Sequence, residues 1–170
     1  QQFIGNGKVR RNGLYTINLS GGSVNSEEFM EFLKEQFVEH DIAPQSICFE
    51  ITETTAIANL DQAAQLIHSL KELGCRFALD DFGTGMSSLA YLKNLPVDYL
   101  KIDGGFIKDI DSDRIDYAMV DSFNRLSHLM GIQTIAECVE SESVLKQLQK
   151  IGVDYAQGFC IDKPSPLVFA

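Results

Sequence analysis

Short apolar segments alternate with longer segments of helical periodicity along most of this 170-residue chain. Each short segment has at most seven residues and is rich in β-branched, aromatic or other apolar types, which predicts a strand buried on both faces. The alternation of such strands with helices predicts a parallel sheet that has the helices outside it. The six predicted strands are residues 15–20, 47–52, 76–82, 99–103, 133–139 and 155–159.

The helical segments between these strands have recognisable ends. Asn25 and Glu28 form a capping box at the start of the first helix. A short helix over 87–94 is ended by Pro96, because a proline restricts the residue before it to extended backbone. The three remaining helices each end at a glycine, which suits the position after the last helical turn: Gly74, Gly131 and Gly152.

Two architectures contain a sheet of this kind, the doubly wound sheet and the (β/α)8 barrel. Polar residues lie toward the C-terminal end of each predicted strand, and (β/α)8 enzymes collect their catalytic groups at that end of the barrel. The barrel is therefore the favoured α/β fold. A complete barrel needs ~250 residues, so we expect a partial TIM-like barrel that lacks the N-terminal strands. The polar strand-end residues are Asn18, Glu50, Asp80, Asp81, Lys101, Glu137 and Gln157.

The strand-end residues share one face of the predicted sheet. Because side chains alternate along a strand, Asn18, Glu50 and Lys101 fall in the phase that would line the barrel interior. A solvated loop would explain any one of them equally well, but the repetition on five strands favours a shared centre. One lysine facing several carboxylates leaves excess negative charge, which calls for divalent cations. Oxygen ligands favour Mg²⁺ or Mn²⁺ over zinc.

The densest polar motif is Asp80-Asp81-Phe82-Gly83-Thr84-Gly85. Two adjacent carboxylates at a strand end can flank two cations, and the glycines that follow permit a tight loop. As an isolated pattern the motif is equally typical of a turn. Considered with the other strand ends, it indicates the core of a two-metal site.

The charge balance excludes several function classes. The chain has 24 acidic and 14 basic residues, a net charge of -10, which argues against a partner that is a nucleic acid polymer. No apolar run approaches the ~20 residues that a transmembrane helix requires, so we expect no membrane contact by this segment. The first residues also lack the pattern of a signal peptide.

The histidines and cysteines do not form a catalytic or metal-binding pattern. The histidines lie on or beside predicted helices, away from the strand ends, which disfavours a Ser–His–Asp or Cys–His nucleophile. The cysteines lack CxxC spacing and lie in apolar segments, so we expect reduced core residues of a cytoplasmic protein. The residues concerned are His40, His68 and His128, and Cys48, Cys75, Cys138 and Cys160.

The polar residues belong to ordered motifs that resemble those of EAL domains, the bacterial phosphodiesterases of cyclic di-GMP. The resemblance runs from about Thr16 to Pro164, in the family's order and at similar spacing. The motifs are Asn18-Leu19-Ser20, Glu50-Ile51-Thr52-Glu53, Asp80-Asp81-Phe82-Gly83-Thr84-Gly85, Leu95-Pro96-Val97-Asp98, Lys101-Ile102-Asp103, Ala136-Glu137 with Val139-Glu140, and Gln157-Gly158.

The resemblance implies a barrel in which two Mg²⁺ or Mn²⁺ ions activate a water that hydrolyses cyclic di-GMP to linear pGpG. Lys101 would orient or help to deprotonate the water, and Glu137 would be a carboxylate of the metal site or its water network. Gln157 would orient water or substrate. Glu53 would stabilise the loop over 81–88, which also helps to form a dimer contact. The implied metal ligands are Asn18, Glu50, Asp80 and Asp81.

The chain departs from the family pattern at several points. Met86 stands where an aromatic residue is frequent, and Cys138 stands where glycine is usual. The segment with the Glu-Ala-Leu motif, which supplies a further metal-ligating glutamate and a substrate-binding arginine, is expected to precede Gln1. We therefore expect residues 1–170 to be the C-terminal two-thirds, roughly, of an EAL domain, with no phosphodiesterase activity alone.

Two other functions remain open from the sequence. A degenerate EAL domain would bind cyclic di-GMP or a protein partner without turnover, and an unrelated Mg²⁺-dependent barrel enzyme would act on a carbon acid. The resemblance also implies a homodimer. It is compatible with an upstream regulatory or GGDEF-type domain, and with membrane anchoring through domains outside this chain.

Overall fold

Among the residues that the structure describes, the sheet consists of seven strands in the order β1-β7-β6-β5-β4-β3-β2. The computed structural model describes residues 2–3, 13–24, 27–85 and 89–163. Strands β2 to β7 pair in parallel with their neighbours in the chain, whereas β1, which the strand pattern did not predict, pairs antiparallel with β7. The strands are β1 (Gln2–Phe3), β2 (Tyr15–Asn18), β3 (Ile47–Thr52), β4 (Arg76–Phe82), β5 (Tyr99–Ile102), β6 (Gln133–Ala136) and β7 (Tyr155–Ala156).

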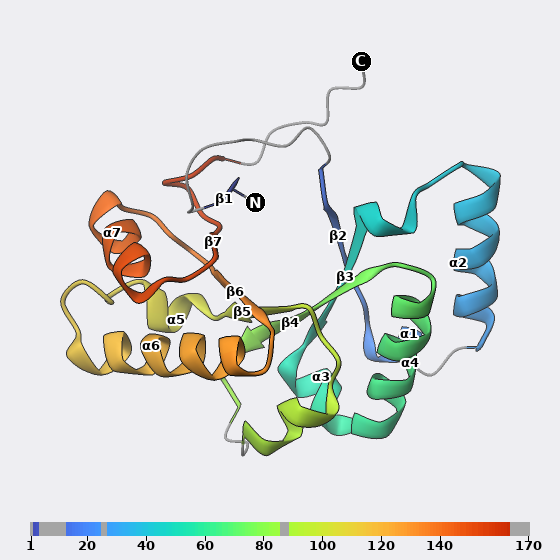
Figure 1. Ribbon diagram of the computed structural model, residues 1–170, viewed down its shortest axis with the longest axis horizontal. Helices are drawn as coiled ribbons and strands as arrows, with labels where there is room; N and C mark the ends of the chain where they lie inside the picture. The colour runs from blue at the N-terminus through green and yellow to red at the C-terminus, as the bar shows by residue number, and fades with distance from the viewer. Residues whose placement is uncertain (1, 4–12, 25–26, 86–88, 164–170) are drawn as a thin grey trace.

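The sequential order of the parallel strands decides between the two candidate architectures. A doubly wound sheet reverses its strand order at a switch point, and the order from β2 to β7 contains no reversal. The helices lie outside the curved sheet, as Figure 1 shows for α2 and α4 on one side and α6 and α7 on the other. The partial (β/α)8 barrel is therefore confirmed.

The helical segments are mostly those that the sequence predicts. The predicted helix over 87–94 is instead a 3₁₀ helix, and its first two residues lie outside the described part of the chain, as does Asn25 of the capping box. The segments are α1 (Gly21–Val24), α2 (Glu27–Glu39), η1 (Pro44–Ser46), α3 (Glu53–Ala58), α4 (Leu60–Glu72), η2 (Leu89–Asn94), α5 (Gly104–Ile107), α6 (Arg114–Leu129) and α7 (Glu142–Ile151).

Helices α6 and α7 begin at side-chain caps, whereas α4 has none. Asp113 accepts hydrogen bonds from the backbone N–H groups of Ile115 and Asp116 at the start of α6, and Ser141 caps α7 in the same way. These side chains satisfy backbone donors that have no partner within the helix. Gly152 ends α7 in the left-handed conformation that its position in the sequence predicts.

The two faces of the sheet are packed differently. The outer face packs against the helices through alternate apolar residues such as Phe49, Phe77 and Leu100, each at most 1% exposed. The inner face carries a separate buried cluster with one residue from each of β3 to β6, namely Cys48, Ala78, Tyr99 and Ile135. Side chains two positions apart on a strand point to the same face. Two positions after each member of this cluster the residue is charged: Glu50, Asp80, Lys101 and Glu137.

Strand β2 contradicts the expectation that every strand is buried on both faces. It is the last strand of the sheet, and all four of its residues are exposed, including Tyr15 at 59% and Ile17 at 43%. A strand with one neighbour lacks the contacts that bury an interior strand. The exposure of β2 is thus a property of its edge position, which the residue pattern alone does not reveal.

The cysteines follow the prediction only in part. Cys48 and Cys75 are buried, and burial raises the pKa of these thiols to about 12 and about 11, with the Glu50 charge adding to the effect at Cys48. Cys138 is exposed and Cys160 is partly exposed, so these two are not core residues. Cys138 follows the last residue of β6 by two positions, where the chain turns away from the sheet.

The turn after β7 supports a prediction about stability. Gly158 has a φ of 155°, and an added Cβ would lie 2.3 Å from the backbone nitrogen of Val139 and 2.4 Å from its carbonyl oxygen. We expect Gly158→Ala to lower the free energy of unfolding by about 2–4 kcal/mol, through backbone strain and overpacking together. Urea denaturation measures the loss.

Gly131→Ala is the matched control. Gly131 also has a positive φ, 75°, but an added Cβ would meet no atom within 4 Å. Its cost should be limited to the left-handed backbone, about 1–2 kcal/mol. Equal losses in the two variants would contradict a steric role for the contact between Gly158 and Val139.

Candidate functional site

Lys101 is the centre of the charged layer on the inner face. Its Nζ lies 3.0 Å from Oε2 of Glu50, 2.8 Å from Oδ1 of Asp80 and 2.9 Å from Oε1 of Glu137. Lys101 and Glu50 are each only 4% exposed. The four residues come from β3, β4, β5 and the segment directly after β6, so the barrel mouth, which we define as the C-terminal end of the parallel strands, brings them together.

The electrostatics of this cluster follow from its burial and its charges. Burial lowers the pKa of Lys101, but hydrogen bonds to Asp80 and Glu137 and the nearby carboxylate charges outweigh burial, so its pKa is raised. Burial also raises the pKa of Glu137, against the opposing effect of Lys101. Lys101 is thus held as an ammonium ion in this arrangement.

Asp80 and Asp81 lie side by side because the strand is irregular at this point. Consecutive residues of a regular strand point to opposite faces, but the register of β4 with β5 shifts between Leu79 and Phe82. Asp81 has a φ of 55°, an unusual value for a residue other than glycine, and its backbone N–H donates to Oδ1 of Asp80 at 3.0 Å. The bulge therefore turns both carboxylates toward the mouth.

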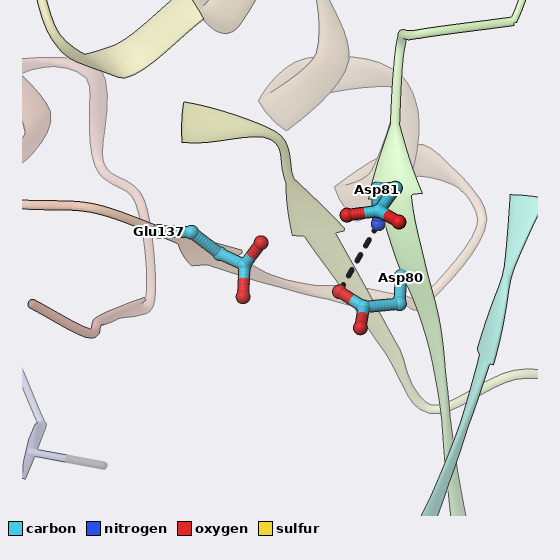
Figure 2. Close-up of side chains that lie close together, drawn as sticks. All are labelled: Asp80, Asp81 and Glu137. Atoms are coloured by element: carbon cyan, nitrogen blue, oxygen red, sulfur yellow. Dashed lines mark hydrogen bonds between the residues drawn. The ribbon is translucent and has the colours of Figure 1, made fainter. Parts of the chain in front are cut away.

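Asp80, Asp81 and Glu137 form a set of oxygen donors that could hold a cation. One carboxylate oxygen from each lies within 4.8 Å of the others, and Figure 2 shows Glu137 directed toward the two aspartates. Burial and the charges of Asp80 and Asp103 raise the pKa of Asp81. With Glu50, the mouth has four carboxylates and one ammonium, an excess of three negative charges when all are ionised. Such a donor set fits Mg²⁺ or Mn²⁺.

Asn18 and Gln157 lie at the two sides of this cluster. Asn18 ends β2 and pairs in register with Glu50, while Gln157 follows β7 and donates its backbone N–H to Ala136 at 2.8 Å. Both side chains are exposed. The fold places these two residues at opposite edges of the six parallel strands, and it places the remaining predicted site residues between them.

Glu53 is buried beneath the loop that follows β4, with only 2% of its surface exposed. Its Oε2 accepts hydrogen bonds from the backbone N–H groups of Gly83 at 3.0 Å and Gly85 at 3.3 Å. Its Oε1 accepts a hydrogen bond from the hydroxyl of Tyr91 at 2.7 Å. Met86 and Ser88, which belong to the same predicted loop, lie outside the described residues.

No role was predicted from the sequence for two residues near the site, Tyr91 and Asp103. Tyr91 supports Glu53, and burial together with Glu53 raises the pKa of the Tyr91 hydroxyl. Asp103 caps α5 by accepting a hydrogen bond from the N–H of Gly105 at 2.8 Å, so its carboxylate serves a helix start. The Asp-Gly-Gly sequence after a strand is a usable signal for such a cap, whereas the contact of Tyr91 spans 38 residues and leaves no local pattern.

The three histidines lie where the sequence predicts, on or next to helices. His68 is on α4 and approaches Glu72 at 3.4 Å, His40 follows α2, and His128 is on α6. Nε2 of His128 lies 2.8 Å from Asp154, which precedes β7. That contact is at the N-terminal end of the strands, opposite the mouth.

Comparison with known proteins agrees with this geometry. A family model described as "EAL domain" matches residues 2–164. The chain is 46% identical over 162 residues to the cyclic di-GMP phosphodiesterase PdeB of Shewanella oneidensis, covering 95% of this chain and 19% of that protein. The chain spans about a fifth to a quarter of the length of these curated relatives that it matches.

Solved structures give the same result. The phosphodiesterase PaMucR in complex with c-di-GMP has a TM-score of 0.83 and 34% identity, over 89% of this chain and 61% of that chain. The manganese/cy-diGMP complex of Klebsiella pneumoniae BlrP1 has a TM-score of 0.79 and 32% identity, over 85% of this chain and 37% of that chain.

The burial of Lys101 leads to a prediction about stability. Lys101→Met keeps an unbranched side chain but leaves Glu50, Asp80 and Glu137 facing one another without a counter-ion. We expect a loss of about 3–5 kcal/mol in the free energy of unfolding without divalent cations. Added MgCl₂ should reduce the loss, because a bound cation would compensate the carboxylates. Urea denaturation with and without MgCl₂ measures both effects.

Arg125→Met serves as the control for this measurement. Arg125 forms an ion pair with Asp121 at 3.1 Å, but its side chain is 75% exposed. An exposed pair contributes little, so we expect a change within about 0.5 kcal/mol and no dependence on MgCl₂. A similarly small effect of Lys101→Met would contradict the buried ion cluster.

Proposed function

The chain belongs to the EAL domain family, and we propose that the intact domain hydrolyses one phosphodiester bond of cyclic di-GMP to give linear pGpG. The observation that carries the proposal is the convergence of Glu50, Asp80, Asp81 and Glu137 around Lys101 at the mouth. Such a group of carboxylates suits metal-assisted hydrolysis of an anionic substrate. We further propose that residues 1–170 form roughly the C-terminal two-thirds of the domain.

We propose a role for each residue at the mouth. Asn18, Glu50, Asp80 and Asp81 would hold two Mg²⁺ or Mn²⁺ ions. When bound, these ions would stabilise the developing charge and lower the pKa of the attacking water. One water is added: its oxygen bonds to phosphorus, one P–O ester bond breaks, the departing oxygen accepts one proton of the water, and the other proton is released to solvent.

The remaining site residues act on the water, the substrate or the loop. Lys101 would orient or help to deprotonate the attacking water. Glu137, next to it, can accept a proton or hold the water network. Gln157 offers an amide at the rim of the mouth for water or substrate, and Glu53 holds the loop after Asp81 through its bonds to Gly83 and Gly85.

A receptor that binds cyclic di-GMP without turnover is less well supported. Buried carboxylates lower the stability of the fold unless they are paired. A domain that no longer catalyses a reaction is not under selection to keep them. The chain retains a polar residue at each predicted site position, from Asn18 to Gln157. The enzyme is therefore the function that the residues favour.

The setting of the domain forms part of the same proposal. We place it in the cytoplasm, as a homodimer that binds neither nucleic acid polymers nor membrane through this segment. A regulatory or GGDEF-type domain upstream is consistent with the greater length of the relatives. In the described part of the chain, the helices are too short or too polar to cross a bilayer.

Asp80→Asn tests the proposed metal site. The variant removes one charge from a crowded anionic cluster while keeping the shape of the side chain, so the fold should persist. Hydrolysis of cyclic di-GMP should disappear, because a cation would lose a charged oxygen ligand. Calorimetry with Mg²⁺ and a turnover assay on the same preparation measure both effects. Retained turnover would show that Asp80 is not a ligand.

The chain alone provides a second test. A protein extended upstream through the Glu-Ala-Leu segment should hydrolyse cyclic di-GMP in the presence of Mg²⁺, whereas residues 1–170 alone should show little or no turnover. The reason is that Mg²⁺ requires near-complete oxygen coordination, and the upstream glutamate would supply one ligand. Equal rates would contradict this account of the site.

A further inference from the structure

Two segments of the chain have the same construction around the mouth. The first unit consists of α4, β4 and β5, and the second of α6, β6 and β7. In each unit a Val-Asp-Tyr sequence leads into the last strand, at residues 97–99 and 153–155. The aspartate precedes a proposed site residue by three positions in both cases, Lys101 in the first unit and Gln157 in the second.

In the first unit Asp98 ties the start of β5 to two neighbouring elements. Its Oδ2 accepts a hydrogen bond from the backbone N–H of Phe77 at 2.9 Å, and its own N–H donates to the carbonyl oxygen of Phe77 at 2.9 Å. Its Oδ1 lies 2.7 Å from Nζ of Lys71 on α4. Phe77 is three residues before Asp80, so this contact joins β4 and β5 at a fixed distance from the mouth.

In the second unit Asp154 makes similar contacts, except that its own N–H donates to the hydroxyl oxygen of Thr134 at 3.4 Å and not to a carbonyl oxygen. Its Oδ2 accepts hydrogen bonds from the backbone N–H of Thr134 at 2.8 Å and from its hydroxyl at 3.2 Å. The same oxygen lies 2.8 Å from Nε2 of His128 on α6. Thr134 is three residues before Glu137, and His128 is six before Thr134, as Lys71 is six before Phe77.

Among the parallel strand pairs of the described residues, the two pairs that these aspartates join have the fewest residues in register. The register of β4 with β5 shifts between Leu79 and Phe82, and β7 pairs with β6 through only Tyr155 and Ala156. A slip of one residue would turn each inward side chain to the outer face. In β5 such a slip would move Lys101 into the apolar outer layer.

We propose that Asp98 and Asp154 are positioning residues, one for each unit, that fix the register of β5 and β7 and so hold Lys101 and Gln157 at the mouth. The effect on turnover rests on the proposed function, because it requires that Lys101 and Gln157 act in the reaction. The effect on strand register does not depend on that function.

The test compares Asp98→Ala with Asp98→Asn in the protein extended through the Glu-Ala-Leu segment. Asp98→Ala should accelerate amide hydrogen exchange in residues 99–102 and lower kcat by about tenfold to a hundredfold with KM nearly unchanged, because Lys101 is displaced. Asp98→Asn keeps an oxygen acceptor for the Phe77 N–H, so it should restore most of kcat. Asp154→Ala should accelerate exchange in 155–157 and lower kcat in the same way.

Two controls separate positioning from loss of stability. Lys71→Ala removes the ion pair with Asp98 and the hydrogen bond to the carbonyl oxygen of Pro96, but it leaves the bonds between Asp98 and Phe77 in place. It should therefore leave kcat close to that of the unmodified protein. Val144→Ala, in the buried face of α7, should lower stability without changing kcat below its melting temperature. Unchanged kcat and exchange in Asp98→Ala would overturn the proposal, as would an equal loss of kcat in Val144→Ala.

The outcome also distinguishes this inference from the proposed function. If the unmodified extended protein fails to hydrolyse cyclic di-GMP, the proposed function fails. The hydrogen-exchange measurement alone then tests whether Asp98 fixes the register of β5. Faster exchange confined to 99–102 in Asp98→Ala would then support the anchoring role. Unchanged exchange there would overturn it.

Discussion

The ion cluster around Lys101 is the interaction on which the rest of the structure depends. An ammonium group that is 4% exposed would cost several kcal/mol without partners. Its three carboxylate partners come from β3, β4 and the end of β6, so all four strands from β3 to β6 must be in register for the charges to meet. An arrangement in which one strand has slipped would leave buried charges unpaired and would be less stable. The correct strand register and the formation of the site therefore depend on each other.

The mouth departs from the most stable arrangement in ways that suit a binding site. Burial and like charges raise the pKa of Asp81, and burial raises that of Glu137, so ionising these carboxylates is less favourable than it is in water. Asp81 and Cys138 each follow an acidic mouth residue, and both adopt positive φ, at 55° and 53°. The packing accommodates Cys138 because Gly104 leaves room for it: a Cβ at Gly104 would lie 2.6 Å from the Cys138 sulfur. Strain and unfavourable charge are typical of sites retained for function.

The predictions that succeeded rest on local periodicity, and those that failed depend on contacts between distant residues. Glu50 and Lys101 were assigned to the interior because alternation along a strand is a property of the backbone. The exposure of Tyr15 and Ile17 follows from the position of β2 at the sheet edge, and a strand sequence does not record how many neighbours the strand has. The bulge at Asp81 was also invisible, since positive φ at an aspartate is set by the surrounding packing rather than by propensity.

The two layers of the inner face explain why the charges gather at one end of the strands. Cys48, Ala78, Tyr99 and Ile135 form an apolar floor directly below the charged residues, and the helices cover the outer face. The apolar floor therefore separates the cluster from the other end of the strands. In such surroundings electrostatic interactions are screened less than in bulk water. A cation that enters from the mouth meets an excess of negative charge held by rigid strands, and the protein needs little reorganisation to bind it. The same apolar floor that stabilises the barrel thus strengthens the attraction of the site for a cation.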